Sequence, residues 1–215
     1  METRLASAPC PGPVAEGPPN RKRQQVIQAA AELFIAQGYG AVSMDAVARA
    51  AGVSKATLYA HFASKDALFA TIVGEAARRG PAEPSQLPAR VENVEAALRA
   101  LGGKLLHFLL EPRTVAIARV AIAESARFPE LGAAFLASGP MAFQTQVAAW
   151  LGRLHAQGAI HAPDADLAAQ HLGALLRGTL HIEALLTPGF APDEARIEAA
   201  VDGAVGAFLR AYAVQ

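Results

Sequence analysis

Apolar residues recur at helical spacing along most of the chain, beginning near Asn20. The first stripe stops where Gly38 can end a helix, and its members are Val26, Ile27, Ala30, Leu33 and Phe34. A second stripe follows Ser64, a residue that can cap a helix, and it consists of Leu68, Phe69, Ile72, Val73 and Ala76. The pattern predicts a helix at each stripe.

Between these stripes, residues 42–62 predict two short helices joined by a tight turn at Gly52. Ser43 and Ser54 stand where N-cap hydroxyls would accept hydrogen bonds from the first amides of each helix. Glycine tolerates the positive φ needed to leave the first helix. In the second helix Leu58 and Phe62, four residues apart, are expected to face inward. The exposed side chains would then be Lys55, Thr57, Tyr59 and His61.

Prolines and glycines divide the rest of the chain into further helices. A break at Gly80, Pro81, Pro84 and Pro88 predicts a linker between two domains. Beyond it, helices are predicted near 89–110, 113–127, 130–157, 164–187 and 192–213. The pair Gly139-Pro140 is expected to kink or split the third of these. The predicted fold is all-α, with a three-helix helix-turn-helix domain over 20–80 and a helical bundle over 81–215.

Composition narrows the class of protein. Of 215 residues 53% are hydrophobic, but charges, glycines and prolines interrupt every run that could span a membrane. Residues 1–19 contain five prolines and lack a secretory signal pattern, so a disordered arm and a cytoplasmic location are expected. Cys10 is the only cysteine, which excludes an intramolecular disulfide and a cysteine-based metal cluster.

Charge is distributed unevenly although the formal net charge is zero. Residues 20–66 hold six Lys or Arg against three acids, whereas residues 67–215 hold twelve against fourteen. The basic excess therefore coincides with the helix-turn-helix, as expected for a protein that contacts phosphates. Arg21, Lys22 and Arg23 begin the first helix, where positive charge is unfavourable, and we predict phosphate or minor-groove contacts for them; a solvated helix start is the alternative.

Several segments in residues 21–79 share one register with a known family. They are Ala-Ala-Ala-Glu-Leu-Phe ending at Phe34, Gly38-Tyr39, Val47-Ala48, Ala51-Gly52-Val53-Ser54, Thr57-Leu58-Tyr59, His61-Phe62 and Ser64-Lys65-Asp66-Ala67-Leu68. In these segments the chain resembles the TetR family of bacterial transcriptional regulators. The resemblance implies a homodimer that binds a palindromic DNA operator and a C-terminal domain that binds a small effector. The stretch Ile122 to Phe135 is also similar to that of many members.

The resemblance implies a role for each residue of the motif. Lys55 and Thr57 would make base-edge or groove contacts, Tyr59 and His61 would contact phosphates, and Lys65 would contact a phosphate at the start of the next helix. The family often has glycine where this chain has Ala56, whose methyl would restrict base approach or touch a thymine methyl. The complete predicted DNA-contacting set is Arg21, Lys22, Arg23, Ser43, Ser54, Lys55, Ala56, Thr57, Tyr59, His61 and Lys65.

In the C-terminal domain, aromatic and polar side chains at helical spacing are candidates to line an effector pocket. The candidates are His107, Phe108, Arg119, Glu124, Phe128, Phe143, Trp150, Arg177 and His181. The alternatives are core packing for the aromatic residues and a structural ion pair for Arg119 with Glu124. His171 and His181 are ten residues apart, which does not match the i, i+4 spacing of a helical metal pair, so no metal and no cofactor are predicted.

The last two predicted helices carry apolar stripes wider than one intrachain contact needs. A four-helix dimer interface is predicted there, with a purely intrachain core as the alternative. The interface residues would be Leu172, Leu175, Leu176, Leu180, Val201, Val205 and Phe208.

Together these features predict a ligand-responsive, dimeric transcriptional regulator, most simply a repressor that an apolar or aromatic effector releases from an inverted-repeat operator. One rival is a helical enzyme tethered to DNA, but the chain has no phosphate-binding glycine loop and no recognisable nucleophile and base motif. Another is a non-specific DNA-organising protein, for which the small basic excess is too weak. The chain is therefore not expected to be an enzyme or to associate with a membrane.

Overall fold

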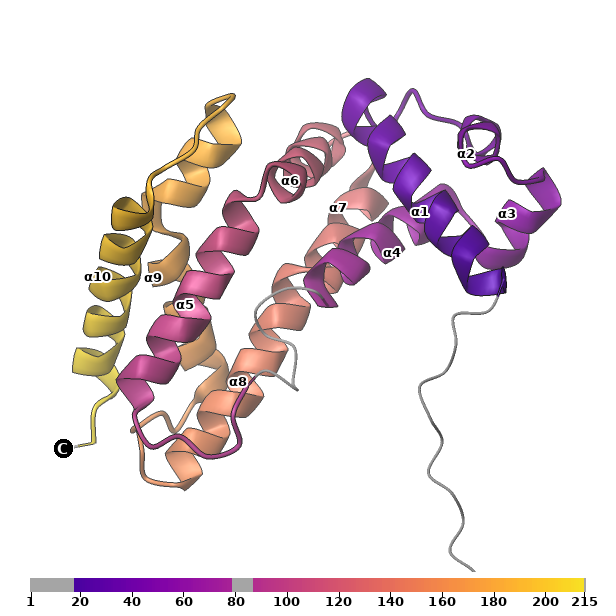
Figure 1. Cartoon of the computed structure of the whole chain (residues 1–215). Helices are drawn as coiled ribbons and strands as arrows, with labels where there is room; N and C mark the ends of the chain where they lie inside the picture. Colours follow the sequence, from indigo (N-terminus) through magenta and orange to yellow (C-terminus); the bar gives the residue numbers. More distant parts are fainter. Residues whose placement is uncertain (1–17, 79–86, 215) are drawn as a thin grey trace, which may run out of the picture.

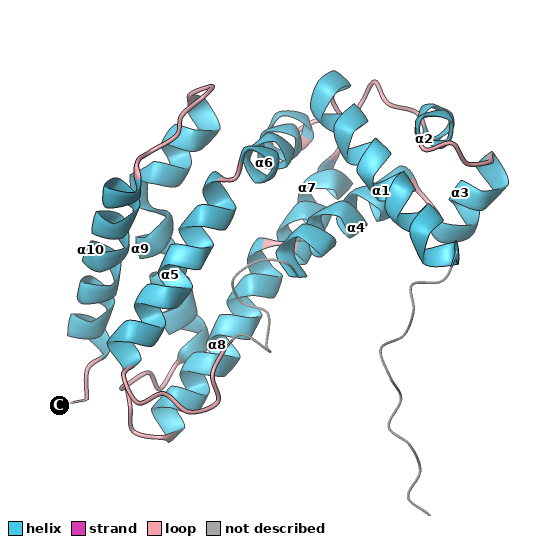
Figure 2. Ribbon diagram, in the orientation of Figure 1, coloured by secondary structure: helices cyan, strands magenta, loops and turns pink. Residues whose placement is uncertain are grey.

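The computed structural model describes residues 18–78 and 87–214, and within them every regular element is an α-helix (Figure 1, Figure 2). The all-α prediction is confirmed. The predicted arm, apart from residues 18 and 19, and most of the predicted linker lie outside the described residues. None of the described helices is long and apolar enough to cross a membrane.

The N-terminal part is built from α1 (Pro18–Gln37), α2 (Met44–Ala50), α3 (Lys55–His61) and α4 (Lys65–Arg78). We call these four helices the head. All three predicted serine caps are present: the hydroxyls of Ser43, Ser54 and Ser64 accept from the N–H groups of Ala46, Thr57 and Ala67, each at 3.1 Å. Gly38 and Gly52 follow α1 and α2 with φ of 80° and 65°, a conformation that side chains with a Cβ rarely adopt.

The remaining helices form the body, which lies beside the head on the side away from α2 and α3 (Figure 1). They are α5 (Val94–Leu110), α6 (Pro112–Glu124), α7 (Pro129–Ser138), α8 (Pro140–Ala156), α9 (Ala165–Leu186) and α10 (Glu194–Tyr212). Proline occupies the first position of α6, α7 and α8, where its missing N–H costs nothing. The predicted helix 130–157 is split at Gly139, as the Gly-Pro pair indicated.

Two hydrophobic cores hold the described residues together. The body core, from α5, α8, α9 and α10, surrounds the fully buried Trp150 and Phe208. The head core surrounds Phe34 and Phe69, and it also takes in Ile117, Ala121 and Leu131 from α6 and α7. The head core therefore extends past the predicted domain boundary at residue 80, so α6 and α7 of the body are packed directly against the head.

Candidate functional site

The second helix of the motif, α3, presents the surface that the sequence assigns to DNA. Leu58 and Phe62 are buried, which confirms the predicted inward face, while Tyr59 is 44% exposed. Lys55 and Ala56 are also exposed. Thr57 and His61, which were predicted to face solvent, are half-buried; the Thr57 hydroxyl lies 2.8 Å from the Ser54 hydroxyl at the start of the helix. The projecting face of α3 is therefore narrower than the sequence indicated.

Lys55 does not stand free on this face. Its ammonium lies 2.9 Å from one carboxylate oxygen of Asp45 on α2 and 3.1 Å from the other. The hydrogen bond to Asp45 raises the pKa of Lys55, which keeps the side chain charged. Asp45 lies in the first turn of α2 and was not predicted as part of the site. One feature of the sequence could have pointed to Asp45: it places a negative charge near the start of a motif that should bind phosphates.

The three basic residues at the start of α1 differ in their surroundings. Arg21 and Lys22 are exposed, and DNA contact remains a prediction for them. Arg23 instead turns inward, where its guanidinium pairs with Glu75 of α4 and lies 5.7 Å from the centre of the Phe62 ring. The prediction of a DNA contact for Arg23 is corrected accordingly, because an ion pair and a buried ring hold the side chain against α4.

Lys65 has a structural role that the sequence did not predict. Its ammonium donates to the carbonyls of Tyr39 (2.8 Å) and Val42 (2.9 Å) and lies 4.2 Å from the centre of the Tyr39 ring. Burial lowers the pKa of Lys65. The Tyr39 hydroxyl donates to Asp66, and burial followed by this bond raises the pKa of Tyr39. The start of α4 thus fixes the turn between α1 and α2, and a phosphate contact by Lys65 stays a prediction.

Two of the predicted effector ligands lie at the junction between head and body instead. The Glu124 carboxylate, at the end of α6, accepts a hydrogen bond from Gly40 N–H at 3.2 Å. The Phe128 ring packs edge-on against Tyr39 with 5.2 Å between ring centres. Both predictions were wrong because these side chains anchor the α1–α2 turn to the body, a contact between segments more than 80 residues apart that no local pattern reveals.

One further candidate, Arg119, stabilises a helix end. Arg119 donates to the carbonyls at the C-terminus of α9, at 2.7 Å to Ala184, 2.8 Å to Leu185 and 3.2 Å to Thr187. These acceptors lack partners within the helix, so a guanidinium there has a structural explanation. The predicted pairing with an effector, and the alternative pairing with Glu124, are both corrected.

His107 is exposed, and its ring is held by two hydrogen bonds. Its ring bonds the Gly103 carbonyl at 2.7 Å and the Glu194 carboxylate at 3.0 Å. These two contacts, the backbone one first, raise the pKa of His107. The side chain ties α5 to the start of α10, which corrects the prediction of an effector contact.

The other candidates differ in their burial. Trp150 is fully buried in the body core and donates to the Pro88 carbonyl at 3.1 Å, so its predicted pocket role is replaced by a core role. Phe143 packs partly buried against the same core, and Phe108 is half-buried. Arg177 is exposed; His181 is half-buried, and burial followed by the charge of Arg177 lowers the pKa of His181. Effector contact by these last four residues stays a prediction.

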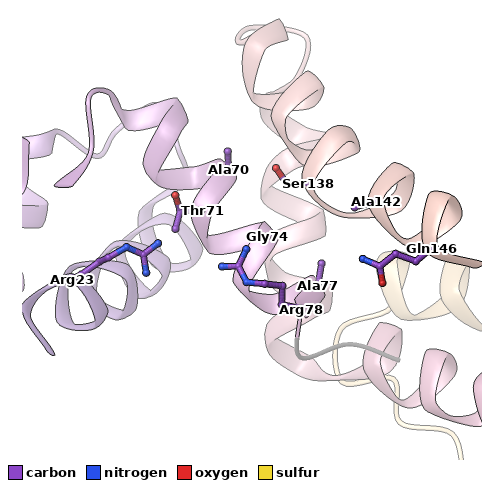
Figure 3. A pocket seen from close by; sticks show the side chains of 9 residues that line it. All are labelled: Arg23, Ala70, Thr71, Gly74, Ala77, Arg78, Ser138, Ala142 and Gln146. Carbon is purple, nitrogen blue, oxygen red and sulfur yellow. The ribbon is translucent and has the colours of Figure 1, made fainter. Parts of the chain in front are cut away.

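A pocket of about 500 Å³ lies elsewhere, between the head and the body (Figure 3). We call it the junction pocket. One wall comes from α1 and α4 and the other from α7 and α8. Its lining residues are Arg23, Ala70, Thr71, Gly74, Ala77, Arg78, Ser138, Ala142 and Gln146. None of these residues was predicted to bind an effector. Small residues on a helix, such as the alanines here, usually mark positions where helices pack together.

Six of the seven predicted dimer-interface residues are buried within the protomer. They are Leu172, Leu176, Leu180, Val201, Val205 and Phe208, each at most 5% exposed. The intrachain alternative is therefore correct for these six, since α9 and α10 need their apolar stripes to pack on α5 and α8. Leu175 alone is exposed, at 41%, and α9 also exposes Leu167, Ile182 and Leu186. These four leave an apolar face on α9 uncovered in the protomer.

The histidines of the body are engaged with neighbouring groups. His171 shares a 2.7 Å hydrogen bond with the Tyr212 hydroxyl, and the rings of His155 and His161 lie 5.8 Å apart. No group of three or more His, Cys, Asp or Glu side chains suited to a metal occurs in the described part of the chain.

Two family models match the chain and together span most of both parts. Residues 26–72 match "Bacterial regulatory proteins, tetR family", and residues 96–214 match "AefR-like transcriptional repressor, C-terminal domain". The first match contains α2, α3 and most of the head core, and the second contains nearly all of the body.

Similar proteins include curated regulators that match over a short part of the chain. The HTH-type transcriptional activator FasR of Mycolicibacterium smegmatis is 45% identical over 56 residues, which is 26% of each chain. UidR of Escherichia coli K12, an HTH-type transcriptional regulator, is 40% identical over 58 residues, 27% of this chain and 29% of its own. The similarity thus spans little more than a quarter of these relatives.

Solved structures match over nearly the whole length. A TetR-family transcriptional regulator from Mesorhizobium loti is 32% identical with a TM-score of 0.80, covering 92% of this chain and 99% of its own. The flavonoid-responsive regulator FrrA is 37% identical with a TM-score of 0.73, covering 89% of this chain and 97% of its own. Both the order of the helices and the arrangement of head and body are therefore shared.

Proposed function

This chain belongs to the TetR family of bacterial transcriptional regulators, and from that premise we propose that it binds an inverted-repeat operator as a homodimer and leaves it when a small effector binds. Members of the family are DNA-binding transcriptional regulators that usually act as dimers and respond to small molecules. For this chain we propose three things: an operator in the form of an inverted repeat, repression as the direction of regulation, and the chemical class of the effector.

The exposed face of α3 is the observation that carries the proposal. Lys55, Ala56 and Tyr59 project from a seven-residue helix whose opposite side, through Leu58, is fully buried. A short helix locked in this way can enter a major groove as a rigid body, since phosphate contacts fix its register and groove-facing side chains read the bases. Two such helices related by a twofold axis match an inverted repeat.

Repression is favoured over activation by the C-terminal match. The model for the AefR-like repressor domain covers residues 96–214, whereas the similarity to the activator FasR is confined to 56 residues. DNA-binding motifs are shared by both kinds of regulator, so the longer C-terminal match is the more informative one. We therefore propose a repressor that an effector releases without any turnover of that effector.

An apolar or aromatic effector remains the proposed class. The similar regulator FrrA is described as flavonoid-responsive, and flavonoids are aromatic. Pockets between packed helices in general bind molecules with an apolar body and a few polar anchors.

The test combines footprinting with two substitutions in α3. Footprinting on DNA selected by the protein should protect an inverted repeat. Tyr59→Phe removes only a hydroxyl and should weaken binding about fivefold on every operator variant, as loss of one hydrogen bond to phosphate predicts. Thr57→Ala should instead change the preference at one base pair in each half-site.

The matched control is Tyr212→Phe, which removes a hydroxyl in the body and should leave DNA affinity unchanged. Affinities are measured by fluorescence anisotropy at one fixed salt concentration. Protection without symmetry, or binding that ignores sequence, would contradict the proposal. Equal losses on all operators after Thr57→Ala would reject base reading by that residue.

A further inference from the structure

The junction pocket is lined by the head and the body together. Figure 3 shows Arg23 of α1 on one side of α4 and Ser138 of α7 on the other, with Thr71, Gly74 and Arg78 of α4 between them. The pocket volume of about 500 Å³ falls in the range of small-molecule sites. An occupant of this pocket would touch both parts of the molecule at once.

Small residues keep the pocket open. Ala70, Gly74 and Ala77 lie on one side of α4, and Ala142 lies on the facing wall. A methyl group added at Gly74 would lie 3.8 Å from the Ser138 Cβ, which is ordinary contact distance. The two walls are therefore close at this point, and longer side chains at these four positions would fill the space that is now available to an apolar ligand body.

The charge of the pocket is positive and incompletely balanced. Arg23 and Arg78 both lie near a single carboxylate, that of Glu75, whose side chain is only 11% exposed. Arg23 takes the close contact, while the Arg78 guanidinium is 3.9 Å from the same oxygen and its side chain is 65% exposed. Arg78 thus has most of its hydrogen-bonding capacity left, and a guanidinium binds a carboxylate through two parallel bonds.

Neutral polar groups complete the lining opposite the arginines. Ser138 and Gln146 supply a hydroxyl and an amide on the body side, and no acidic side chain is among the described lining residues. The lining thus combines two arginines, of which Arg78 is the less engaged, with neutral polar groups and alanines on both walls, and it fits a molecule with one anionic group and a compact apolar body.

We propose that the junction pocket binds a small aromatic carboxylate, with its carboxylate on Arg78 and its ring between α4 and α8, and that this ligand is the effector. The inference rests on the proposed ligand response and adds its site and chemical class. The Arg23–Glu75 pair, which links α1 to α4, borders the same pocket, so a second anion beside it changes the electrostatic balance that holds α1 on α4.

The test measures the binding of three acids to the full chain by isothermal titration calorimetry. The acids are 1-naphthoate, benzoate and indole-3-acetate. At least one acid should bind with one site per protomer, and its matched neutral amide should bind about tenfold more weakly. Arg78→Ala should weaken binding of the acid about tenfold and Arg78→Lys should weaken it less. Arg153→Ala removes an exposed arginine of α8 outside the pocket and should have no effect.

A second variant tests the cavity independently of charge. Ala142→Phe places a ring in the pocket and should abolish binding of acid and amide alike, while circular dichroism and operator binding report that the protein is folded. Equal effects of Arg78→Ala and Arg153→Ala, unaltered binding by Ala142→Phe, or no binding by any of the three acids would overturn the assignment.

Operator affinity, measured on the same preparations, separates this inference from the proposed function. Operator binding that persists while none of the acids binds overturns the pocket assignment and leaves the DNA-binding function standing. Acid binding that follows the predicted pattern but leaves operator affinity unchanged overturns the assignment of the acid as effector. A fall in operator affinity that Arg78→Ala prevents supports both.

Discussion

Lys55 and Asp45 form an ion pair on the surface where DNA is expected to bind. Both side chains are at least half exposed, so the pair contributes little to folding stability. Lys55 is predicted to contact DNA, and to do so it must give up this carboxylate, which stays near the DNA backbone. We therefore predict that Asp45 lowers the affinity of α3 for DNA of any sequence.

Asp45→Asn should raise DNA affinity. The substitution removes one negative charge beside Lys55, and an increase of about fivefold at low salt is expected from the size of exposed ion pairs. The gain should appear on operator and non-operator DNA alike, and it should shrink as salt is added. Anisotropy titrations at several salt concentrations measure it.

The matched control for this change is Glu95→Gln. It removes the carboxylate of a second exposed ion pair, which Glu95 forms with an arginine of α5. It should leave DNA affinity unchanged. An Asp45→Asn protein with wild-type affinity at every salt concentration would show that Lys55 does not take part in phosphate contact.

At the scale of elements, the turn between α1 and α2 is held from two directions. Lys65 and Asp66 at the start of α4 bind it from one side, and Glu124, the last residue of α6, with Phe128, which precedes α7, binds it from the other. Gly38 and Gly40 allow this close approach: a Cβ at Gly38 would lie 2.9 Å from a Glu124 carboxylate oxygen. The turn thus ties the helix-turn-helix to the body.

Glu124→Gln tests this connection. The substitution keeps the shape of the side chain but weakens its hydrogen bond to Gly40 N–H, so the free energy of unfolding should fall by about 1 kcal/mol. Urea unfolding followed by circular dichroism measures the change. Glu198→Gln, at an exposed position of α10, should cost much less. Equal stability of the two variants would exclude a stabilising role for the Glu124 contact.

Element types and most helix ends follow from local chemistry. Serine caps, Gly38 and Gly52, and the prolines that open α6, α7 and α8 act within one turn of the chain, and this is why the split at Gly139 could be predicted. The break within α9 at Gly178, with φ of 42° and ψ of −144°, was not predicted. A single glycine in a long helical stripe gives no local signal that distinguishes tolerance from a kink.

At the scale of the whole molecule, α9 presents an uncovered apolar face. Leu175, Ile182 and Leu186 are 41%, 56% and 76% exposed in the protomer. The proposed homodimer would bury this face, since two copies of one helix can pack across a twofold axis. Only side chains outside the protomer core can make such contact. The exposed side chains of α9 are therefore the proposed interface, in place of the six predicted residues that are buried in the protomer.

Ile182→Asp should dissociate the proposed dimer. A carboxylate at this position would be buried without a partner twice in the interface, and the dimer dissociation constant should rise at least about a hundredfold. Sedimentation velocity measures the change, and affinity for the inverted repeat should fall with it. Leu136→Asp places the same charge at an exposed leucine of α7 and should leave the oligomeric state unaltered. A dimer that survives Ile182→Asp would place the interface elsewhere.

The sequence by itself determined the helices, the inward face of α3 and the motif that identifies the family, because capping, turn conformation and helical periodicity depend on residues within about four positions of each other. Tertiary structure decided which side chains are free to act. Arg23, Glu124, Arg119 and Trp150 all have partners more than 50 residues away, and no spacing in the sequence encodes such pairs. The junction pocket exists for the same reason: its walls come from helices that only folding brings together.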